Sequence, residues 1–487
     1  MIRQRCDLLQ RGTAPESNAM PSSARGWRLS RRHFLATLTA TATAVNTASH
    51  AQPPHPASRR TPPHVRVVDA RVTFSPQQLV TPLRLSTGVI TDVTQATAEV
   101  LVEVAGAGRA TGRGTVYLSD LWAWPSNQLS HAQRDSALQQ LCTNIADQLP
   151  AQFGGEHTHP CELGMQLHDW VCHIGHPVQP PRLARMLCGS PFDAAIHDGT
   201  GLALKCSAFD LYRQPVKLPS VDRLFGRDGA CRAIDEVITK PRFTLPAWYV
   251  VNRGDDLDVT LAAAIQKSGI THFKLKLSGD NDQDVRRTVD VYRGAKSLGV
   301  QQPRLCLDSN GGNPDANSVR EFLRRLESTD PLAYQAVFYV EHPTDRDIRR
   351  HAFDWNEVAA RKPVVLDEGL TSVDVLSVAQ RQGWSGFALK TCKGHSFMLV
   401  VAAWAARAGM LITLQDLTNP GIALVHAALM AAHLPTLNGV ELNSPQFTPA
   451  ANLALAHRFP QLFEPSGGVH RLRPHLPAGL GSSWETE

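Results

Sequence analysis

Eight short apolar runs, separated by amphipathic stretches, constrain the fold of this 487-residue chain more than any other feature. The runs are residues 246–251, 272–277, 304–308, 337–341, 363–367, 386–390, 410–414 and 438–442. Apolar runs that alternate with helical stretches predict parallel strands joined by crossover helices. Eight such repeats predict an α/β fold of the (β/α)8-barrel type, and an open doubly wound sheet is the alternative.

Four glycines support this reading. Gly269, Gly299, Gly383 and Gly409 each fall between a helical stretch and the next apolar run. Glycine readily adopts the left-handed conformation that ends a helix and turns the chain back. We therefore expect a helix to end at each of these positions.

Ionisable residues stand at or near the C-terminal ends of five consecutive runs. They are Lys276, Asp308, Glu341, Asp367 and Lys390. Active sites of such barrels lie at the C-terminal ends of the strands, so we expect these side chains to converge. Lys274 shares a strand face with Lys276, and two neighbouring ammonium groups are rare in an ordinary core.

The three acids predict a metal site. Asp308, Glu341 and Asp367 would form an all-oxygen site that suits a hard divalent cation such as Mg²⁺, or Mn²⁺ in its place. Such a cation stabilises the enediolate that forms when a proton is removed α to a carboxylate. Each acid alone could instead be a helix N-cap. Glu368 competes with Asp367 for the role of third ligand, because strand parity does not separate neighbours.

The two lysines predict the acid and base. A second cation, a nearby metal and burial would each lower the pKa of Lys276 and make it a better base. Lys390, on the sixth run, would face Lys276, on the second, across the barrel. Two lysines on opposite faces of a flat enediolate can deprotonate one side and reprotonate the other. Lys393 is expected to face solvent, and His342 to pack at a strand end.

Five short motifs at these strand ends suggest a family. They are Lys274-Leu275-Lys276, Asp308-Ser309-Asn310, Glu341-His342-Pro343, Asp367-Glu368 and Lys390. Together they resemble the motif series of the enolase superfamily, in its mandelate racemase and muconate lactonizing enzyme group. The muconate lactonizing enzyme and dipeptide epimerase branch is the most similar. The resemblance covers residues 65–449.

The resemblance implies roles for the motif residues. Asp308, Glu341 and Asp367 would bind Mg²⁺, and Lys276 and Lys390 would be the acid/base pair. The other motif residues would surround the substrate carboxylate and the metal ligands: Lys274, Asn310 and Glu368.

The resemblance also implies a domain organisation. Residues 65–235 would form an α+β capping domain, and the loop at residues 79–91 would close over the substrate. Residues 240–445 would form the barrel, and residues 446–487 would pack back on the cap. Members of this family favour homo-oligomers, so we expect one here.

Two departures from the family pattern bear on the substrate. The seventh run carries no histidine, which argues against mandelate racemase-type chemistry. The eighth run ends in Glu441 and Asn443, where dipeptide epimerases resemble Asp-x-Asp and hold the substrate ammonium. We expect Glu441 and Asn443 to contact the substrate, and Glu441 could equally be a salt-bridge partner.

These features predict a Mg²⁺-dependent racemase or epimerase of an amino-acid or dipeptide-like carboxylate. A cycloisomerase or dehydratase of a carboxylic or sugar acid would use the same enediolate. A protein of another class, a catalytically inactive binding protein, would have no use for the buried lysines and acids.

The region before the barrel predicts strands over residues 65–118 and helices over residues 131–149, capped by Ser130, and 192–211. Residues 157–176 hold five histidines and two cysteines. They fit an accessory metal site, a disulfide between Cys161 and Cys172, or a histidine-rich surface loop.

The N-terminal segment predicts an export signal. Residues 30–35 pair Arg31 with Arg32 ahead of a mildly apolar run, which resembles a twin-arginine signal with cleavage after Ala51. Residues 1–51 would then be the signal, read by the twin-arginine export machinery, and residues 52–64 a linker. The protein would be exported to a bacterial periplasm.

The net charge of +5 is not clustered, which argues against a nucleic-acid partner. No apolar run is long enough for a membrane anchor.

Overall fold

The computed structural model describes residues 62–485, apart from residues 127 and 214. The twin-arginine segment, its cleavage site and nearly all of the expected linker lie outside the described residues and stay predictions. In the described part of the chain, no helix is both long and apolar enough to cross a membrane.

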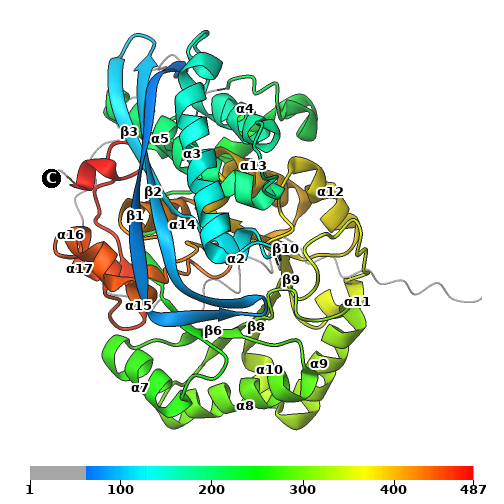
Figure 1. Ribbon diagram of the computed structural model, residues 1–487. Helices are drawn as coiled ribbons and strands as arrows, with labels where there is room; N and C mark the ends of the chain where they lie inside the picture. The colour runs from blue at the N-terminus through cyan, green and yellow to red at the C-terminus, as the bar shows by residue number, and fades with distance from the viewer. Residues whose placement is uncertain (1–61, 127, 214, 486–487) are drawn as a thin grey trace, which may run out of the picture. The chain divides into compact units, whose positions relative to one another are not determined.

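The first part of the chain forms an antiparallel sheet covered by helices. The sheet has the order β1-β2-β3, with β1 at Val65–Leu85, β2 at Gly88–Val104 and β3 at Gly108–Tyr117. Three helices follow: α3 at His131–Phe153, α4 at Pro160–His173 and α5 at Arg182–Leu204. Helices α3 and α5 pack on the sheet and α4 packs on α5 (Figure 1). This is the expected α+β cap.

Helix α3 begins where the sequence predicts. The Ser130 hydroxyl accepts a hydrogen bond from the Gln133 amide, and the Gln133 side chain accepts one from the Ser130 amide. This capping box satisfies two amides that the first helical turn leaves free. The helix continues past the expected end at Leu149 to Phe153.

Helix α5 differs from the expected helix at residues 192–211, because it begins at Arg182 and ends at Leu204. Pro191 lies inside it and cannot donate to the carbonyl of Leu187. The Ser190 hydroxyl donates to that carbonyl instead, at 2.8 Å. The helix therefore tolerates a proline that the sequence alone reads as a boundary.

Two glycines of β3 let α5 approach the sheet. A Cβ atom at Gly112 would lie 2.0 Å from the carbonyl oxygen of Ala195, and one at Gly114 equally close to that of Pro191. Only glycine fits such a contact. Gly112 and Gly114 thus mark the sheet–helix interface.

The histidine- and cysteine-rich stretch at residues 157–176 lies largely in helix α4. The reading as a surface loop is wrong, because His159, Cys161 and His168 are buried. The reading as a disulfide is also wrong, since both cysteines lie on this one helix and are free. His159 caps the helix by accepting from the Cys161 amide at 3.2 Å. The structure thus assigns this stretch to the core of the cap.

The barrel contains seven parallel strands in the order β11-β10-β9-β8-β7-β6-β5. They are β5 Trp248–Val251, β6 His272–Lys276, β7 Arg304–Asp308, β8 Val337–Glu341, β9 Val364–Leu366, β10 Gly386–Lys390 and β11 Leu411–Gln415. The (β/α)8-type prediction is therefore confirmed, with each of these strands at its expected apolar run.

The eighth run is not a strand but makes a single parallel bridge, between Gln415 and Glu441. The Asn438 side chain bonds the amide and the carbonyl of Leu414, at 3.0 and 3.1 Å. The Asn438 side chain thus supplements a short main-chain ladder, in which the Glu441 amide donates to the Leu414 carbonyl and the Asp416 amide to the Glu441 carbonyl, both at 3.0 Å.

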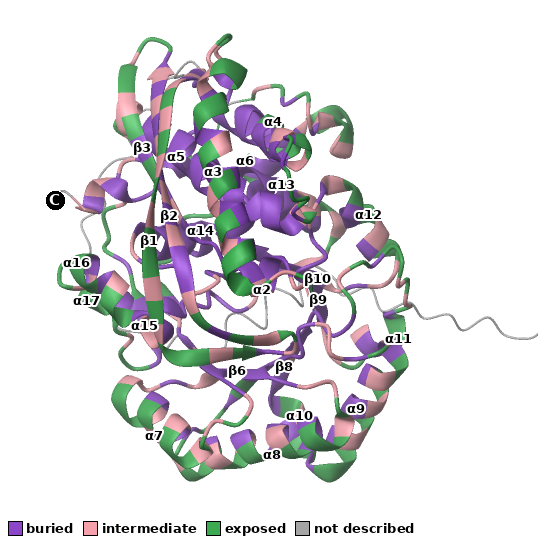
Figure 2. Ribbon diagram, in the orientation of Figure 1, coloured by how far each residue is buried: buried purple, intermediate pink, exposed green. Residues whose placement is uncertain are grey.

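Helices surround the barrel. They are α7 Leu257–Ser268, α8 Asn281–Ser297, α9 Ala316–Thr329, α10 Pro331–Ala336, α11 Asn356–Ala359, α12 Val373–Arg381, α13 His395–Ala408 and α14 Ile422–His433. The four predicted turn glycines all have positive φ, from 68° at Gly269 to 91° at Gly299. Helices α7 to α9 expose one face, whereas α13 and α14 are buried almost throughout (Figure 2). Helix α13 is buried because it packs against both the barrel and the cap.

The remaining elements are short. They comprise α2 Asp120–Ala123, η1 Ala208–Asp210, η2 Asp222–Leu224, η3 Gly226–Asp228, α6 Ala230–Val237, β4 Thr244–Pro246, η4 Thr391–Lys393, α15 Ser444–Phe447, η5 Pro449–Asn452, α16 Leu453–Ala456, α17 Pro460–Phe463, β12 Val469–Arg471 and η6 Ser482–Glu485. Strand β12 pairs antiparallel with β4.

The C-terminal segment returns to the cap, where the Asp198 carboxylate accepts from the Leu480 amide at 2.7 Å and from the Ser482 hydroxyl. Arg113 of β3 pairs with Glu485 at 2.9 Å.

Candidate active site

The predicted residues meet at the C-terminal ends of the barrel strands. Lys276 lies opposite Asp308 in the sheet register, and Asp308 lies opposite Glu341. Asp367 follows β9 and Lys390 ends β10. All five side chains are more than nine-tenths buried. Their strand-end positions therefore bring them together, as the sequence predicts.

Lys274 lies one layer deeper and is shared among three acids. Its Nζ is 2.7 Å from Glu341 Oε1, 3.2 Å from Glu441 Oε2 and 3.3 Å from Asp308 Oδ2. Burial would lower the pKa of Lys274, but these three carboxylates outweigh it and raise the pKa well above its usual value. Lys274 is thus a fixed positive charge.

Lys276 contacts Asp308 and Asn310. Its Nζ lies 2.6 Å from Asp308 Oδ2 and 3.0 Å from Asn310 Oδ1. Burial acts to raise the pKa of Asp308, but Lys276 and Lys274 outweigh it and lower the pKa to about 2. Asp308 therefore stays ionised at neutral pH.

Asp367 holds two lysines. Lys390 Nζ lies 2.6 Å from its Oδ2, and Lys393 Nζ lies 2.8 Å from its Oδ1 and 2.7 Å from its carbonyl oxygen. The prediction that Lys393 faces solvent is wrong: helix η4 turns the chain inward after β10, and the side chain is fully buried. Burial acts to raise the pKa of Asp367, but the two lysines hold it below its usual value.

The pKa of Lys390 is shifted in the direction opposite to that expected of a base. Burial lowers it, but the Asp367 carboxylate outweighs burial and raises the pKa above its usual value. The direct contact with a carboxylate explains the difference, since the sequence shows neighbouring cations but not which acid each one meets. A cation that replaced Lys390 as the partner of Asp367 would remove this rise in the pKa of Lys390.

Glu341 lies where the acids crowd. Burial, together with Asp308, Glu441 and Asp367, raises the pKa of Glu341 to about 8, although Lys274 acts against the shift. The Gln415 amide donates to its Oε2. Gln415 is a site residue that the sequence reasoning missed, although it ends the seventh strand where a histidine was looked for.

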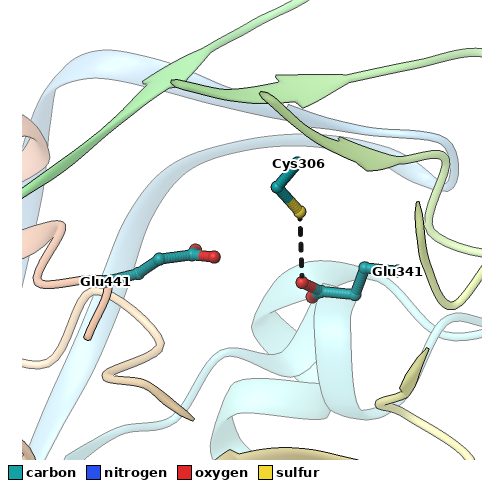
Figure 3. A group of neighbouring side chains, drawn as sticks. All are labelled: Cys306, Glu341 and Glu441. Carbon is teal, nitrogen blue, oxygen red and sulfur yellow. Dashed lines mark hydrogen bonds between the residues drawn. The ribbon is translucent and has the colours of Figure 1, made fainter. Parts of the chain in front are cut away.

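A second possible metal cluster lies beside Glu341. In the described part of the chain, the group of His, Cys, Asp or Glu ligand atoms within 4.8 Å of one another is Cys306, Glu341 and Glu441 (Figure 3). The Cys306 thiol donates to Glu341 Oε2 at 3.6 Å. However, Lys274 Nζ lies within 3.2 Å of both glutamates, so an ammonium is already the cation of this group.

Buried acids and buried lysines face one another at the strand ends. Six carboxyl groups are buried there: Asp308, Glu341, Asp367, Glu368, Asp416 and Glu441. Four buried ammonium groups accompany them: Lys274, Lys276, Lys390 and Lys393. Burial raises the pKa of Glu341 to about 8 and that of Asp416 to about 7, so these two are not fully ionised at neutral pH. The carboxylate oxygens of Asp308, Glu341 and Asp367 do not all lie within 4.8 Å of one another, and each of these acids is paired with a lysine. Three strand-end carboxylates are nevertheless the kind of donor set that Mg²⁺ prefers.

The cap supplies a further side chain. Trp122 of α2 donates through Nε1 to Glu368 Oε1 at 3.0 Å, and Asn310 donates to the same oxygen at 3.1 Å. Lys390 Nζ lies 4.8 Å from the centre of the Trp122 ring. His342 packs at the strand end as predicted, with Nε2 3.5 Å from Glu368 Oε2. Trp122 was missed because nothing in the sequence links a cap tryptophan to the barrel.

The tip of the β1–β2 hairpin covers the strand ends (Figure 1). Ser86 donates through its hydroxyl to the Asn310 carbonyl at 2.7 Å, and Arg253 bonds the Leu85 carbonyl at 3.1 Å. A cavity of about 40 Å³ lies beneath the tip. The described residues that line it are Leu83, Leu85, Ile90, Ser119, Trp122, Val250, Lys274, Lys276, Lys390, Gln415, Leu417, Thr418, Asn443 and Phe447.

Glu441 and Asn443, the two residues of the eighth run that were expected to contact the substrate, lie in different surroundings. Asn443 lines the cavity. Glu441 is fully buried below it, where Oε1 accepts from the Tyr339 hydroxyl at 3.0 Å and Oε2 pairs with Lys274. The salt-bridge role for Glu441 is the one that the structure shows.

Comparisons with known proteins agree with this geometry. Residues 257–487 match the family model described as enolase C-terminal domain-like. No curated protein matches the chain.

Solved structures share the fold of the cap and this enolase-like domain. One is a dipeptide epimerase from Enterococcus faecalis V583, complexed with Mg and the dipeptide L-Leu-L-Tyr. It is 15% identical with a TM-score of 0.61, covering 85% of this chain and 99% of that one. Another is the muconate lactonizing enzyme from Pseudomonas fluorescens, 18% identical with a TM-score of 0.58, covering 85% and 96%. The L-talarate dehydratase from Polaromonas sp. JS666 is 18% identical with a TM-score of 0.55, covering 86% and 94%. At these identities the likeness establishes the fold.

Proposed function

We propose that this protein is a Mg²⁺-dependent enzyme that removes a proton α to a carboxylate, and that it is a racemase or epimerase. One observation carries the proposal: Lys276 and Lys390 line the same cavity from strands β6 and β10, which are separated in the sheet by three other strands. A flat intermediate between them would present one face to each lysine.

The residues divide the work. Asp308, Glu341 and Asp367 would hold Mg²⁺, which supplies a Lewis acid for the substrate carboxylate when bound. Lys274 is a permanent cation beneath the cavity and stabilises negative charge that develops above it. Lys276 takes or returns a proton on one face and Lys390 on the other. The hairpin tip and Trp122 exclude water from this step.

The test is α-proton exchange in D₂O with Mg²⁺, using the full chain and a panel of 2-hydroxy acids, N-acylamino acids and dipeptides as separate enantiomers. We expect exchange with inversion, lost on addition of EDTA. Lys276→Met and Lys390→Met should each lower inversion by about 10² to 10⁴-fold. Each variant should still exchange the enantiomer whose proton faces the remaining lysine.

A matched control is Lys296→Met, because Lys296 is exposed on α8 and bonds the Gln301 carbonyl. It should leave exchange unchanged. If only one of the two site lysines affects exchange and water or another group leaves, the protein is a dehydratase or cycloisomerase. If no compound in the panel exchanges its α-proton and Mg²⁺ does not raise the thermal stability, the remaining alternative is that the protein is a catalytically inactive binding protein.

A further inference from the structure

Two cysteines meet in the core of the cap. Cys142 lies on α3 and Cys188 on α5, the two helices that pack on the sheet and against each other (Figure 1). Both thiols are free, and both side chains are fully buried. The two residues are 46 positions apart in the chain. The fold of the cap, rather than the sequence, therefore brings them together.

Each sulfur reaches the main chain of the opposite helix. The Cys142 thiol donates to the Cys188 carbonyl at 3.8 Å, and the Cys188 thiol donates to the Leu138 carbonyl at 3.6 Å. Leu138 lies about one helical turn before Cys142 on α3. Because these contacts are reciprocal, the two sulfurs lie side by side between the helices.

The two thiols also contact each other. Burial, and next the hydrogen-bond contact with the Cys142 thiol, raise the pKa of Cys188 well above its usual value. The sulfurs of a disulfide lie about 2 Å apart, so rotation of the two side chains would close the remaining gap. The pair is therefore placed for a bond between α3 and α5.

The pair belongs to the core of the cap and not to the barrel-mouth site. The apolar cluster that contains both cysteines also contains Leu138, Leu141 and Leu187. Neither cysteine is among the described residues that line the cavity. A bond between them would act on the stability of the cap and leave the proposed chemistry untouched.

A bond at this place would close a long loop. The loop runs from α3 through the whole of α4 to α5. In the chain-entropy account, a cross-link restricts the unfolded chain and stabilises the fold more as the loop lengthens. A disulfide here would therefore raise the stability of the cap if its native packing accepts the bond.

We propose that Cys142 and Cys188 form a disulfide when the chain folds in the presence of a small disulfide such as oxidised glutathione. The thiolate of one cysteine attacks the small disulfide and releases one reduced glutathione. The other cysteine attacks the resulting mixed disulfide, forms the Cys142–Cys188 bond and releases the second reduced glutathione. Two electrons and two protons pass from the cysteines to one oxidised glutathione.

Burial decides when this reaction takes place. The thiolate is the nucleophile, whereas both thiols of the folded cap are protonated, buried and donate to carbonyls. The small disulfide therefore reaches the cysteines before α3 and α5 close on each other. Refolding is the step at which the bond is to be sought.

The test refolds the full chain from urea in two buffers, one with oxidised and reduced glutathione and one with reduced glutathione alone. Free thiols are then alkylated, and the protein is digested without reduction and mapped by mass spectrometry. We expect a peptide pair joined through Cys142 and Cys188 in the oxidised sample. Its melting temperature should exceed that of the reduced sample by about 3–6 °C.

Three variants locate the effect. Cys142→Ala and Cys188→Ala should each abolish the difference in melting temperature between the two buffers. Cys172→Ala is the matched control, because Cys172 is a half-buried thiol of α4 that glutathione reaches more readily. It should leave the difference unchanged.

The peptide map of the wild-type chain needs no variant, so it stands even if a substitution disturbs folding. Alkylation of both Cys142 and Cys188 after oxidative refolding, or a bond from either one to another cysteine, would overturn the inference. A Cys142–Cys188 bond without a higher melting temperature would show that the native packing does not accept it. Neither measurement uses α-proton exchange, so this inference and the proposed function fail separately.

Discussion

Two of the buried polar clusters among the described residues are built in opposite ways. The charged cluster at the barrel mouth pairs lysines with carboxylates and opens into a cavity. The second cluster, called here the histidine network, lies between the cap and the barrel helices. Its members are Asp193, His197, Tyr212, His395, Ser396 and His426.

The histidine network satisfies its own hydrogen bonds. The Tyr212 hydroxyl lies 2.7 Å from His197 Nδ1 and 2.8 Å from His395 Nε2, and His395 Nδ1 lies 2.7 Å from His426 Nε2. Ser396 donates to Asp193 at 2.8 Å. None of the described residues lining the barrel-mouth cavity belongs to this network. It ties α5 of the cap to α13 and α14 of the barrel.

The difference between the two clusters suggests a structural role for the histidine network and a functional role for the charged cluster. A network with few charges can be satisfied entirely within the protein, and it joins two domains at little cost. Buried ammonium and carboxylate groups are costly to desolvate and are tolerated only when they are paired with one another or with a ligand. Buried charge, rather than buried polarity, therefore distinguishes the proposed active site from the histidine network.

The largest effect should come from breaking the charged cluster at Asp367. Asp367→Ala leaves Lys390 and Lys393 buried without their carboxylate. We expect the free energy of unfolding to fall by about 3–5 kcal/mol, measured by urea denaturation. Adding Lys393→Met to this variant should recover part of the loss, because one unpaired charge disappears.

An exposed ion pair provides the control for this variant. Asp228→Ala removes one of the two carboxylate partners of Arg407 at the surface and should change the free energy of unfolding by less than about 1 kcal/mol. Equal effects of the two substitutions would contradict the view that Asp367 balances buried charge.

A smaller effect should follow from a break in the histidine network. Tyr212→Phe removes one hydroxyl and leaves a nitrogen on each of His197 and His395 without its partner. We expect a loss of about 1–3 kcal/mol in the free energy of unfolding. The α-proton exchange rate per folded molecule should stay the same, and a selective fall in that rate would show that the network takes part in the reaction.

The smallest effect is a difference in pH dependence. Burial lowers the pKa of His426 to about 3, below the value of 6.5 in an unfolded chain. Below about pH 6.5 the unfolded state binds a proton that the folded state does not, so stability falls as the pH decreases toward 3, by at most about 1.4 kcal/mol per pH unit. His426→Gln should flatten this decline in urea titrations between about pH 7 and about pH 5.

The charged cluster should show the opposite sign. The pKa of Glu341 is raised to about 8 in the folded state, above the ordinary 4.5. Between these values the folded state holds the extra proton, so this group favours folding more as the pH falls. Glu341→Gln should therefore steepen the decline that His426→Gln flattens. Slopes that change in the same direction in both variants would contradict the contrast between the clusters.

The sequence predicted the barrel strands and the residues at their ends because both follow from local spacing. An apolar run with a terminal acid is visible in a few letters, and parallel strands bring such ends together. The site acids and lysines could be named for this reason. The eighth run is not a full strand because Asn438 bonds Leu414 through its side chain, which interrupts the main-chain ladder in a way that an apolar pattern cannot reveal.

Contacts between distant segments were not predictable. The burial of Lys393 depends on how η4 turns after β10, and Trp122 reaches the site only because the cap docks on the barrel. The histidine network joins residues up to about 200 positions apart, such as His197 and Ser396, so no local pattern announces it. The direction of the Lys390 pKa shift likewise depends on a partner that only the folded chain identifies.

The anchoring of residues 479–485 on the cap has a consequence for the order in which the domains complete their folding during synthesis. The ribosome makes Asp198 and Arg113 early, yet their partners Leu480, Ser482 and Glu485 emerge nearly three hundred residues later or more. While the whole barrel is translated, the Asp198 carboxylate therefore has the Arg113 amide of the cap as a partner but lacks its C-terminal donors. Completion of the first domain is thus a late event, and a ribosome that stalls before residue 479 releases a chain whose cap lacks its last partners.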